Sequence, residues 1–190
     1  IPKTVVLCTD VFDQFMDNNN LYQLALSDAP DEEILQAFIK AQLPDQFIDD
    51  FKTFFEAIRH PIAIRSSSLL EDSHYQPFAG IYSTYMIPYL EDKDEMLRML
   101  AAAIKSVYAS VYFKDSKAYM TATRNVIDQE KMAVILQEVV GKQYGDHFYP
   151  NFSGVLRSIN YYPLGYEKSE EGIASLALGL GKYIVDGGQT

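Results

Sequence analysis

The stretch from Pro61 to Pro88 constrains the fold of this chain more than any other. Ile62–Ile64 is an apolar run typical of a short buried strand, and Arg65 stands at its end. A hydroxyl-rich turn and an acidic loop come next, and residues 78–80 form a tight turn of small residues. Residues 81–87 then alternate as a second strand would. The stretch therefore predicts two strands joined by a polar loop that carries one fixed cation.

Two interpretations of that loop are open. Backbone N–H groups and serine hydroxyls beside Arg65 can bind an anion, and the guanidinium supplies charge and a planar set of donors. An ordinary hairpin with a surface loop fits the same residues, because short anion-loop patterns have many false positives.

The order and spacing of residues across the stretch resemble the phosphoenolpyruvate synthase and pyruvate phosphate dikinase family. The matching segments are Ala63-Ile64-Arg65-Ser66-Ser67-Ser68, Glu71-Asp72, Phe78-Ala79-Gly80 and Ser83-Thr84. They resemble the phosphate-binding hairpin of that family's ATP-grasp domain. The resemblance implies that Arg65 stabilises charge on the phosphoryl group that is transferred. It also implies ATP contacts from Ser66, Ala79, Gly80, Ile81, Ser83 and Thr84.

Composition and charge narrow the choice of partners. The chain has 190 residues, 48% of them hydrophobic, which is enough for one large domain or a compact group of subdomains. The net charge of −10 argues against a nucleic acid or an anionic membrane surface as the main partner.

The single cysteine, Cys8, excludes an internal disulfide, and we expect it to be a small buried residue. Without a visible signal peptide or membrane-spanning apolar run, we expect a cytoplasmic location.

Helical spacing of apolar residues recurs on both sides of the central stretch. It predicts helices at 21–26, 31–40, 44–58 and 92–120, the last with a break near Lys114. A further helix begins with Thr9 or Asp10 as its cap. Asp92, followed three residues later by Glu95, resembles a capping box. The region of about 18–58 is expected to be a helical insert, and its aromatic stripe is expected to be core.

The segment 132–140 is a nearly continuous apolar strand interrupted by Gln137 and Glu138. One interpretation is a strand end at which polar residues meet water. The other is a hinge whose backbone and carboxylate contact a nucleotide. The family carries a glutamine at this place in its corresponding strand. The resemblance therefore implies that Gln137, Glu138, Val139 and Val140 line the adenine and ribose pocket.

Two more strands are expected at 153–158 and 172–178, followed by a glycine turn at 179–181. They resemble the family's Ser-Gly-Val strand and Gly-Leu-Gly-Glu turn. The sequence departs from the family pattern at two positions that concern the metal. Ser175 and Lys182 stand where the family has acidic residues, and Mg²⁺ prefers carboxylate oxygens. Glu171 is the nearest acid that can reach the metal. The alternative is that Glu171 is an ordinary exposed glutamate in a loop. Lys182 is instead expected beside phosphate.

The resemblance implies an α+β fold of the ATP-grasp type, with mixed sheets flanked by helices, over residues 1–190. It implies a parent enzyme that passes a phosphoryl group from ATP, with Mg²⁺, to a histidine on a separate domain. A pyruvate or phosphoenolpyruvate domain would complete that parent. The alternative is a degenerate or regulatory nucleotide-binding module without phosphotransfer. Because the chain starts at Ile1 without Met, we expect it to be part of a longer protein.

Overall fold

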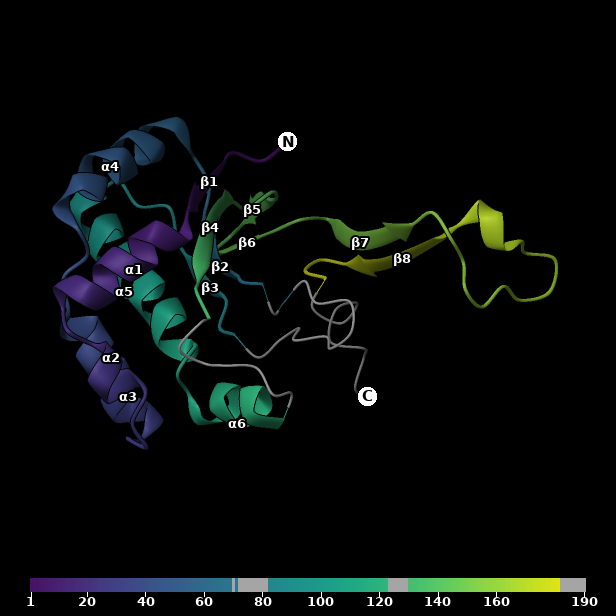
Figure 1. Cartoon of the computed structure of the whole chain (residues 1–190). Coiled ribbons are helices and arrows are strands. Elements are labelled where there is room, and N and C mark those ends of the chain that lie inside the picture. The colour runs from purple at the N-terminus through teal and green to yellow at the C-terminus, as the bar shows by residue number, and fades with distance from the viewer. Residues whose placement is uncertain (70, 72–81, 123–129, 182–190) are drawn as a thin grey trace. The chain divides into compact units, whose positions relative to one another are not determined.

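The computed structural model describes residues 1–69, 71, 82–122 and 130–181. The chain forms two compact units, unit 1 (Ile1–Val139) and unit 2 (Val140–Thr190). Helices and small sheets follow one another along the chain (Figure 1), which confirms the α+β class. Every strand pair that the structure describes is antiparallel.

A four-stranded sheet organises unit 1, with the strand order β1-β4-β2-β3. The strands are β1 (Thr4–Leu7), β2 (Ile62–Ser67), β3 (Tyr85–Ile87) and β4 (Ala133–Glu138). Strands β2 and β3 pair with Ile62 opposite Ile87, so the two strands expected in the central stretch lie side by side. Strand β4, from the 132–140 segment, pairs with both β1 and β2.

Strand β3 is shorter than the alternation of residues 81–87 predicts. Tyr82 lies outside it, is buried, and donates a hydrogen bond of 3.2 Å to the Glu130 carboxylate. In a regular strand Tyr82 would share a face with Met86, which is 59% exposed. The strand begins only at Tyr85, so Tyr82 and Met86 do not belong to one regular strand.

The helices of unit 1 flank its sheet (Figure 1). They are α1 (Thr9–Asn18), α2 (Tyr22–Ala25), α3 (Asp31–Lys40), η1 (Asp45–Phe47, a 3-10 turn), α4 (Ile48–Ala57), α5 (Lys93–Ser110) and α6 (Lys114–Ala122). The break expected near Lys114 is confirmed, and the helix expected over 44–58 is a 3-10 turn followed by α4. Helix α5 packs against β2 and β3, which places a long apolar helix beneath the central hairpin.

The core of unit 1 is built largely from aromatic rings. Phe12 meets Tyr108 edge to face at a centroid distance of 5.0 Å, and Phe15 lies 5.7 Å from Phe38. Such pairs add about 0.5–1.5 kcal/mol to the stabilisation that comes from burial itself. The stripe predicted to be core contributes Phe51, Phe54 and Phe55, all buried.

The Asp92 cap of α5 is confirmed, but the capping box is only half formed. One Asp92 carboxylate oxygen accepts hydrogen bonds from the Asp94 and Glu95 amides, both at 3.0 Å. The Glu95 carboxylate pairs with Arg98 instead of reaching back to the cap. The cap therefore satisfies two amides of the first turn of α5 through one side chain.

The span Lys93–Ala122, which holds α5 and α6, is long and apolar enough to cross a membrane by length and composition alone. However, 61% of its most apolar window is buried inside the fold. A helix whose apolar side chains are already covered by protein has the character of a core helix, and the contacts of α5 with α3 and α4 agree with that role.

Helix α1 begins without the side-chain cap that the sequence suggested. Cys8 is its N-cap residue, and no side chain caps the helix. Cys8 is also exposed, where we expected it to be buried. The reason is its place after β1, because Leu7 takes the inward position and is 5% exposed. The next residue along the alternation then points outward.

Unit 2 consists of two antiparallel strand pairs. They are β5 (Lys142–Tyr144) with β6 (His147–Tyr149), and β7 (Phe152–Arg157) with β8 (Ile173–Leu178). The strands expected at 153–158 and 172–178 are confirmed as β7 and β8, and the 3-10 turn η3 (Ser169–Glu171) lies in the loop between them. The β5–β6 hairpin is not among the strands that we expected from the sequence.

Candidate functional site

Strand register sorts the residues of the central stretch onto two faces of the unit 1 sheet. Successive residues of a strand point to opposite faces. Four side chains on the inner face, toward the core, are fully buried: Ile62, Ile64, Val134 and Leu136. Arg65 lies opposite Ile135, and Gln137 lies opposite Ala63. Arg65 and Gln137 therefore share the other face, which we call the outer face.

The outer face combines a cation, an amide and exposed apolar side chains. Its residues in the four strands are Thr4, Val6, Ala63, Arg65, Ser67, Met86, Ala133, Ile135 and Gln137. Val6 is 49% and Met86 59% exposed, and the Gln137 amide donates a 3.1 Å hydrogen bond to the Thr4 hydroxyl. A face of this kind can hold a flat apolar ring and an anion at neighbouring places.

Arg65 is exposed, and it makes no hydrogen bond or ion pair with any residue that the structure describes. Glu71, which might have neutralised it, is engaged elsewhere. One Glu71 oxygen accepts a 2.8 Å hydrogen bond from the Ser66 hydroxyl, and the other accepts a 3.1 Å bond from the Ser68 amide. The Arg65 guanidinium is therefore able to meet an anion without first breaking a contact with Glu71.

The other residues predicted to bind phosphate lie in different surroundings. Ser66 follows Arg65 in β2, so its side chain belongs to the inner face and is half-buried. Ser83 donates its amide weakly, at 3.5 Å, to the Ser110 hydroxyl of α5, and Thr84 is exposed. Ala79, Gly80, Ile81 and Lys182 lie outside the described residues.

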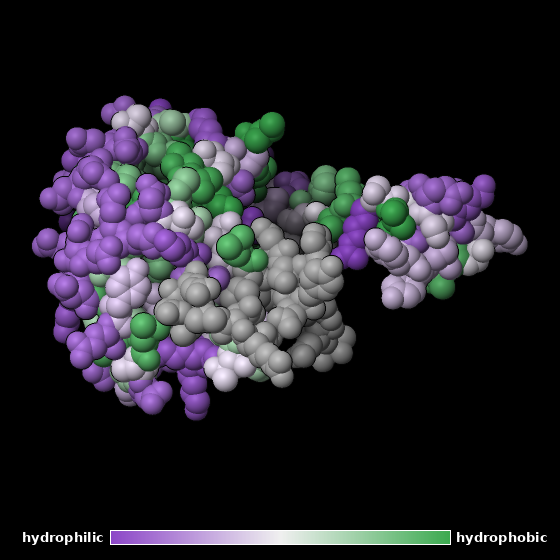
Figure 2. Space-filling view, in the orientation of Figure 1, coloured by the Kyte–Doolittle hydropathy of each residue, from purple (hydrophilic) through white to green (hydrophobic). Residues whose placement is uncertain are grey.

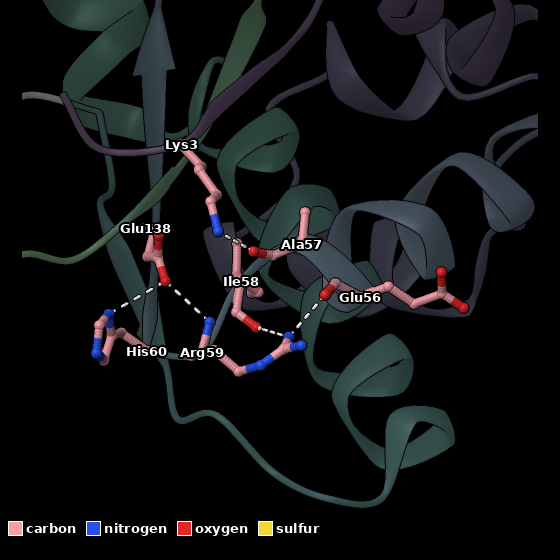
Figure 3. Close-up of polar contacts among 7 residues, drawn as sticks. All are labelled: Lys3, Glu56, Ala57, Ile58, Arg59, His60 and Glu138. Atoms are coloured by element: carbon pink, nitrogen blue, oxygen red, sulfur yellow. Dashed lines mark hydrogen bonds and ion pairs between the residues drawn. The ribbon is translucent and has the colours of Figure 1, made fainter.

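Glu138 stands at the end of β4 and binds the turn that precedes β2 (Figure 3). One of its carboxylate oxygens accepts a 2.9 Å hydrogen bond from the Arg59 amide and lies 3.1 Å from His60 Nδ1. The Glu138 side chain is 12% exposed and that of His60 is 47% exposed. Arg59 and His60 were not singled out from the sequence as partners of Glu138, and no local pattern there signals the contact.

Tyr82 and Glu130 form a buried polar pair, which was also not predicted from the sequence. Tyr82 is 5% and Glu130 7% exposed. Burial raises the pKa of the Tyr82 hydroxyl well above its usual range, and the nearby Glu130 charge raises that pKa further. The neighbouring Ser68 hydroxyl acts in the opposite direction. Tyr82 therefore stays a neutral hydrogen-bond donor to Glu130 at ordinary pH.

The described residues do not form a ligand set for Mg²⁺. Among residues 1–69, 71, 82–122 and 130–181, no group of three or more His, Cys, Asp or Glu side chains lies close enough to hold a metal ion. The carboxylate of Glu171 accepts a 3.1 Å hydrogen bond from the Lys168 amide and is exposed on η3. Ser175 is exposed on β8, opposite Val155. We derive no step through a metal from these residues.

Comparison with known proteins identifies the family of this chain. Residues 1–190 match the family described as the AMP/ATP-binding domain of pyruvate phosphate dikinase. The chain is also 27% identical, over all 190 of its residues, to the uncharacterized phosphotransferase YvkC of Bacillus subtilis (strain 168). It spans 20% of the length of that relative. The family resemblance is thus confirmed over the whole chain, and the chain belongs to the family of pyruvate phosphate dikinase AMP/ATP-binding domains.

Proposed function

We propose that this chain binds ATP and serves as the ATP-binding domain of a phosphotransferase that passes a phosphoryl group to a histidine on another domain. The observation that supports this most is that Arg65 and Gln137 lie on the same face of the unit 1 sheet. A cation and an amide on a partly apolar face suit a ligand that has phosphates at one end and a flat base at the other.

Arg65 has the role of holding phosphate oxygens and stabilising the charge of the phosphoryl group as it moves. A guanidinium can meet two phosphate oxygens with parallel hydrogen bonds. Because phosphoryl transfer depends on positioning and charge stabilisation, one well-placed cation contributes strongly to the rate. Thr84, which is exposed, would add a hydroxyl donor. The Ser66 hydroxyl is bonded to Glu71 and the Ser83 amide to Ser110, so each would have to exchange that bond for one to phosphate.

Gln137, Val139 and Val140 have the role of contacting the base and ribose. Gln137 presents its amide on the outer face, where Ile135 supplies apolar surface beside it. Val139 and Val140 continue the chain beyond β4, and Val140 is 65% exposed. Backbone groups and small apolar side chains are the usual lining of a pocket for a flat, weakly polar ring.

The intact protein is proposed to be a cytoplasmic enzyme that acts on pyruvate or phosphoenolpyruvate through further domains. A second candidate is a regulatory module that binds the nucleotide without transferring phosphate. Ser175 and the lack of an acidic cluster among the described residues favour that second candidate. Phosphohistidine formation by the intact protein with labelled ATP separates the two functions, because a binding module would give none.

ATP binding itself is tested by calorimetry on the chain, on Arg65→Ala and on Arg98→Ala. Arg98 is a matched control because its exposed guanidinium pairs with Glu95 on α5. Loss of a charge-assisted hydrogen bond costs about 1.5–3 kcal/mol, so Arg65→Ala should weaken ATP binding by about 10- to 150-fold. Arg98→Ala should leave it unchanged. Absence of ATP binding by the wild type, or equal affinities for all three proteins, would refute the proposal.

A further inference from the structure

The last residues of unit 1 are held by hydrogen bonds to both neighbouring strands. The Glu138 amide donates to the Lys3 carbonyl at 2.9 Å, just before β1. The Val139 amide donates to the Pro61 carbonyl at 2.8 Å, just before β2. Unit 1 ends at Val139. The backbone conformation of Glu138 and Val139 therefore depends on the positions of the Lys3 and Pro61 carbonyls.

The Glu138 carboxylate fixes the turn that carries Pro61 (Figure 3). Helix α4 ends at Ala57, and the Ile58 amide still finds a helical carbonyl, that of Phe54. The next amide, that of Arg59, bonds instead to Glu138, and His60 lies against the same oxygen. The carboxylate therefore holds Arg59 and His60, and Pro61 follows His60 directly in the chain. The Pro61 carbonyl in turn accepts the hydrogen bond from Val139.

The Glu138 side chain does not point to the outer face. Glu138 lies opposite Ile62, whose side chain belongs to the inner face and is fully buried. Gln137, one residue earlier, points to the outer face. Around the carboxylate, the Arg59 guanidinium bonds to the Ile58 and Glu56 carbonyls, so the contacts to Glu138 come from the Arg59 amide and His60.

We propose that Glu138 is a positioning residue, which acts on the backbone of Val139 through the Arg59–His60–Pro61 turn and does not touch the nucleotide. The link to ligand binding rests on the proposed function, because there Val139 and Val140 contact the base. The carboxylate stabilises one backbone conformation at the end of β4. The proposal gives Glu138 a role different from that of Gln137, although the two are adjacent.

Amide hydrogen exchange measured by NMR tests the positioning role without any ligand. In Glu138→Ala, exchange at the Arg59 and Val139 amides should become about ten-fold faster or more, because the Arg59 amide loses its acceptor and the turn that bonds to Val139 is no longer fixed. Glu138→Gln keeps an acceptor oxygen and should recover most of the protection. His60→Ala should affect Val139 and leave the Arg59 amide bonded. Glu56→Ala is the control, since that residue is exposed on α4 close to the same turn.

ATP affinity measured on the same variants separates positioning from contact. Faster exchange at both amides in Glu138→Ala, together with weaker ATP binding, supports the proposal. Weaker ATP binding with unchanged exchange would mean that the carboxylate touches the ligand, and this result would overturn it. Unchanged exchange in both Glu138 variants would also overturn it. If the wild type binds no ATP while exchange responds as expected, the positioning role stands and the proposed function fails.

Discussion

Removal of the Tyr82 hydroxyl tests how the buried pair beneath the central hairpin stabilises unit 1. Tyr82→Phe keeps the ring and deletes the donor that meets Glu130 at 3.2 Å. Both side chains are buried, at 5% and 7% exposed. A buried acceptor that loses its donor costs about 1–3 kcal/mol. Because Glu130 has further contacts, we expect the lower part of that range, about 1–2 kcal/mol.

The free energy lost should depend on pH, and its sign follows from the raised pKa of Tyr82. In the unfolded chain this hydroxyl ionises near pH 10, whereas in the fold it keeps its proton to higher pH. The unfolded state therefore binds fewer protons above pH 10, and wild-type stability falls there by about 1.4 kcal/mol per pH unit through this group. Tyr82→Phe lacks that group. The stability difference between wild type and variant should thus be constant below pH 9 and smaller by about 1.4 kcal/mol at pH 11.

Other groups that titrate in this range are present in both proteins. Burial lowers the pKa values of Lys105 and Lys117, which makes both proteins more stable as pH rises toward about 10.5. Burial raises the pKa of Tyr108, which acts in the opposite direction above pH 10. Since these residues are unchanged, their contributions cancel in the difference, and the remainder reports on Tyr82.

The assay is urea unfolding followed by circular dichroism at pH 8, 9, 10 and 11. Tyr166→Phe is the control at pH 8, because that side chain is fully exposed and its hydroxyl should contribute nothing measurable. A Tyr82→Phe difference that stays the same from pH 8 to pH 11 would refute the reasoning, since the hydroxyl would then ionise at one pH in both states. A difference near zero at pH 8 would refute the hydrogen-bond contribution separately.

Three further changes have definite expected outcomes. Asp92→Ala removes the cap of α5 and should lower the unfolding free energy by about 1 kcal/mol in denaturant titrations. Gly154→Ala puts a Cβ 2.6 Å from the Ser175 backbone oxygen, so it should cost about 1–3 kcal/mol and speed amide exchange in β7 and β8. Asn19→Ala removes bonds of 2.8–3.0 Å to the Phe15 and Gln42 carbonyls and the Gln42 amide, and the melting temperature should fall by several degrees.

Elements with local signals at their ends could be predicted from the sequence with good bounds. Helix α3 runs over 31–40 as predicted, since acids fill its first turn and Lys40 its last. Asp92 marks the start of α5 for the same kind of local reason. The β5–β6 hairpin also had such a signal, which we overlooked. Gly145-Asp146 is a two-residue turn between two short runs that contain aromatic residues, and Gly145 has a φ of +59°, which favours glycine.

The polar pairs of unit 1 could not be predicted, because distant parts of the chain make them. The Arg59–Glu138 contact joins residues 79 positions apart, and the Tyr82–Glu130 contact joins residues 48 apart. No periodicity or capping rule relates residues at such separations. Tyr82 was placed in an alternating strand for this reason, since the alternation gave no sign that its hydroxyl meets a buried carboxylate.

The position of Arg65 shows how core packing determines the candidate site. Three consecutive buried residues precede it, so alternation alone did not indicate which face of the sheet it would take. The pairing with β4 determines the face that Arg65 takes. Ile64 and Leu136 lie opposite one another and are both fully buried, so Arg65 points to the other face. A register slip of one residue would bury the Arg65 charge and expose Ile64, and each change is costly. The cation on the outer face, opposite Ile135 and near Gln137, is therefore held there by the packing of its apolar neighbours. Among the residues that the structure describes, its guanidinium makes no hydrogen bond or ion pair, so an anionic ligand can reach it.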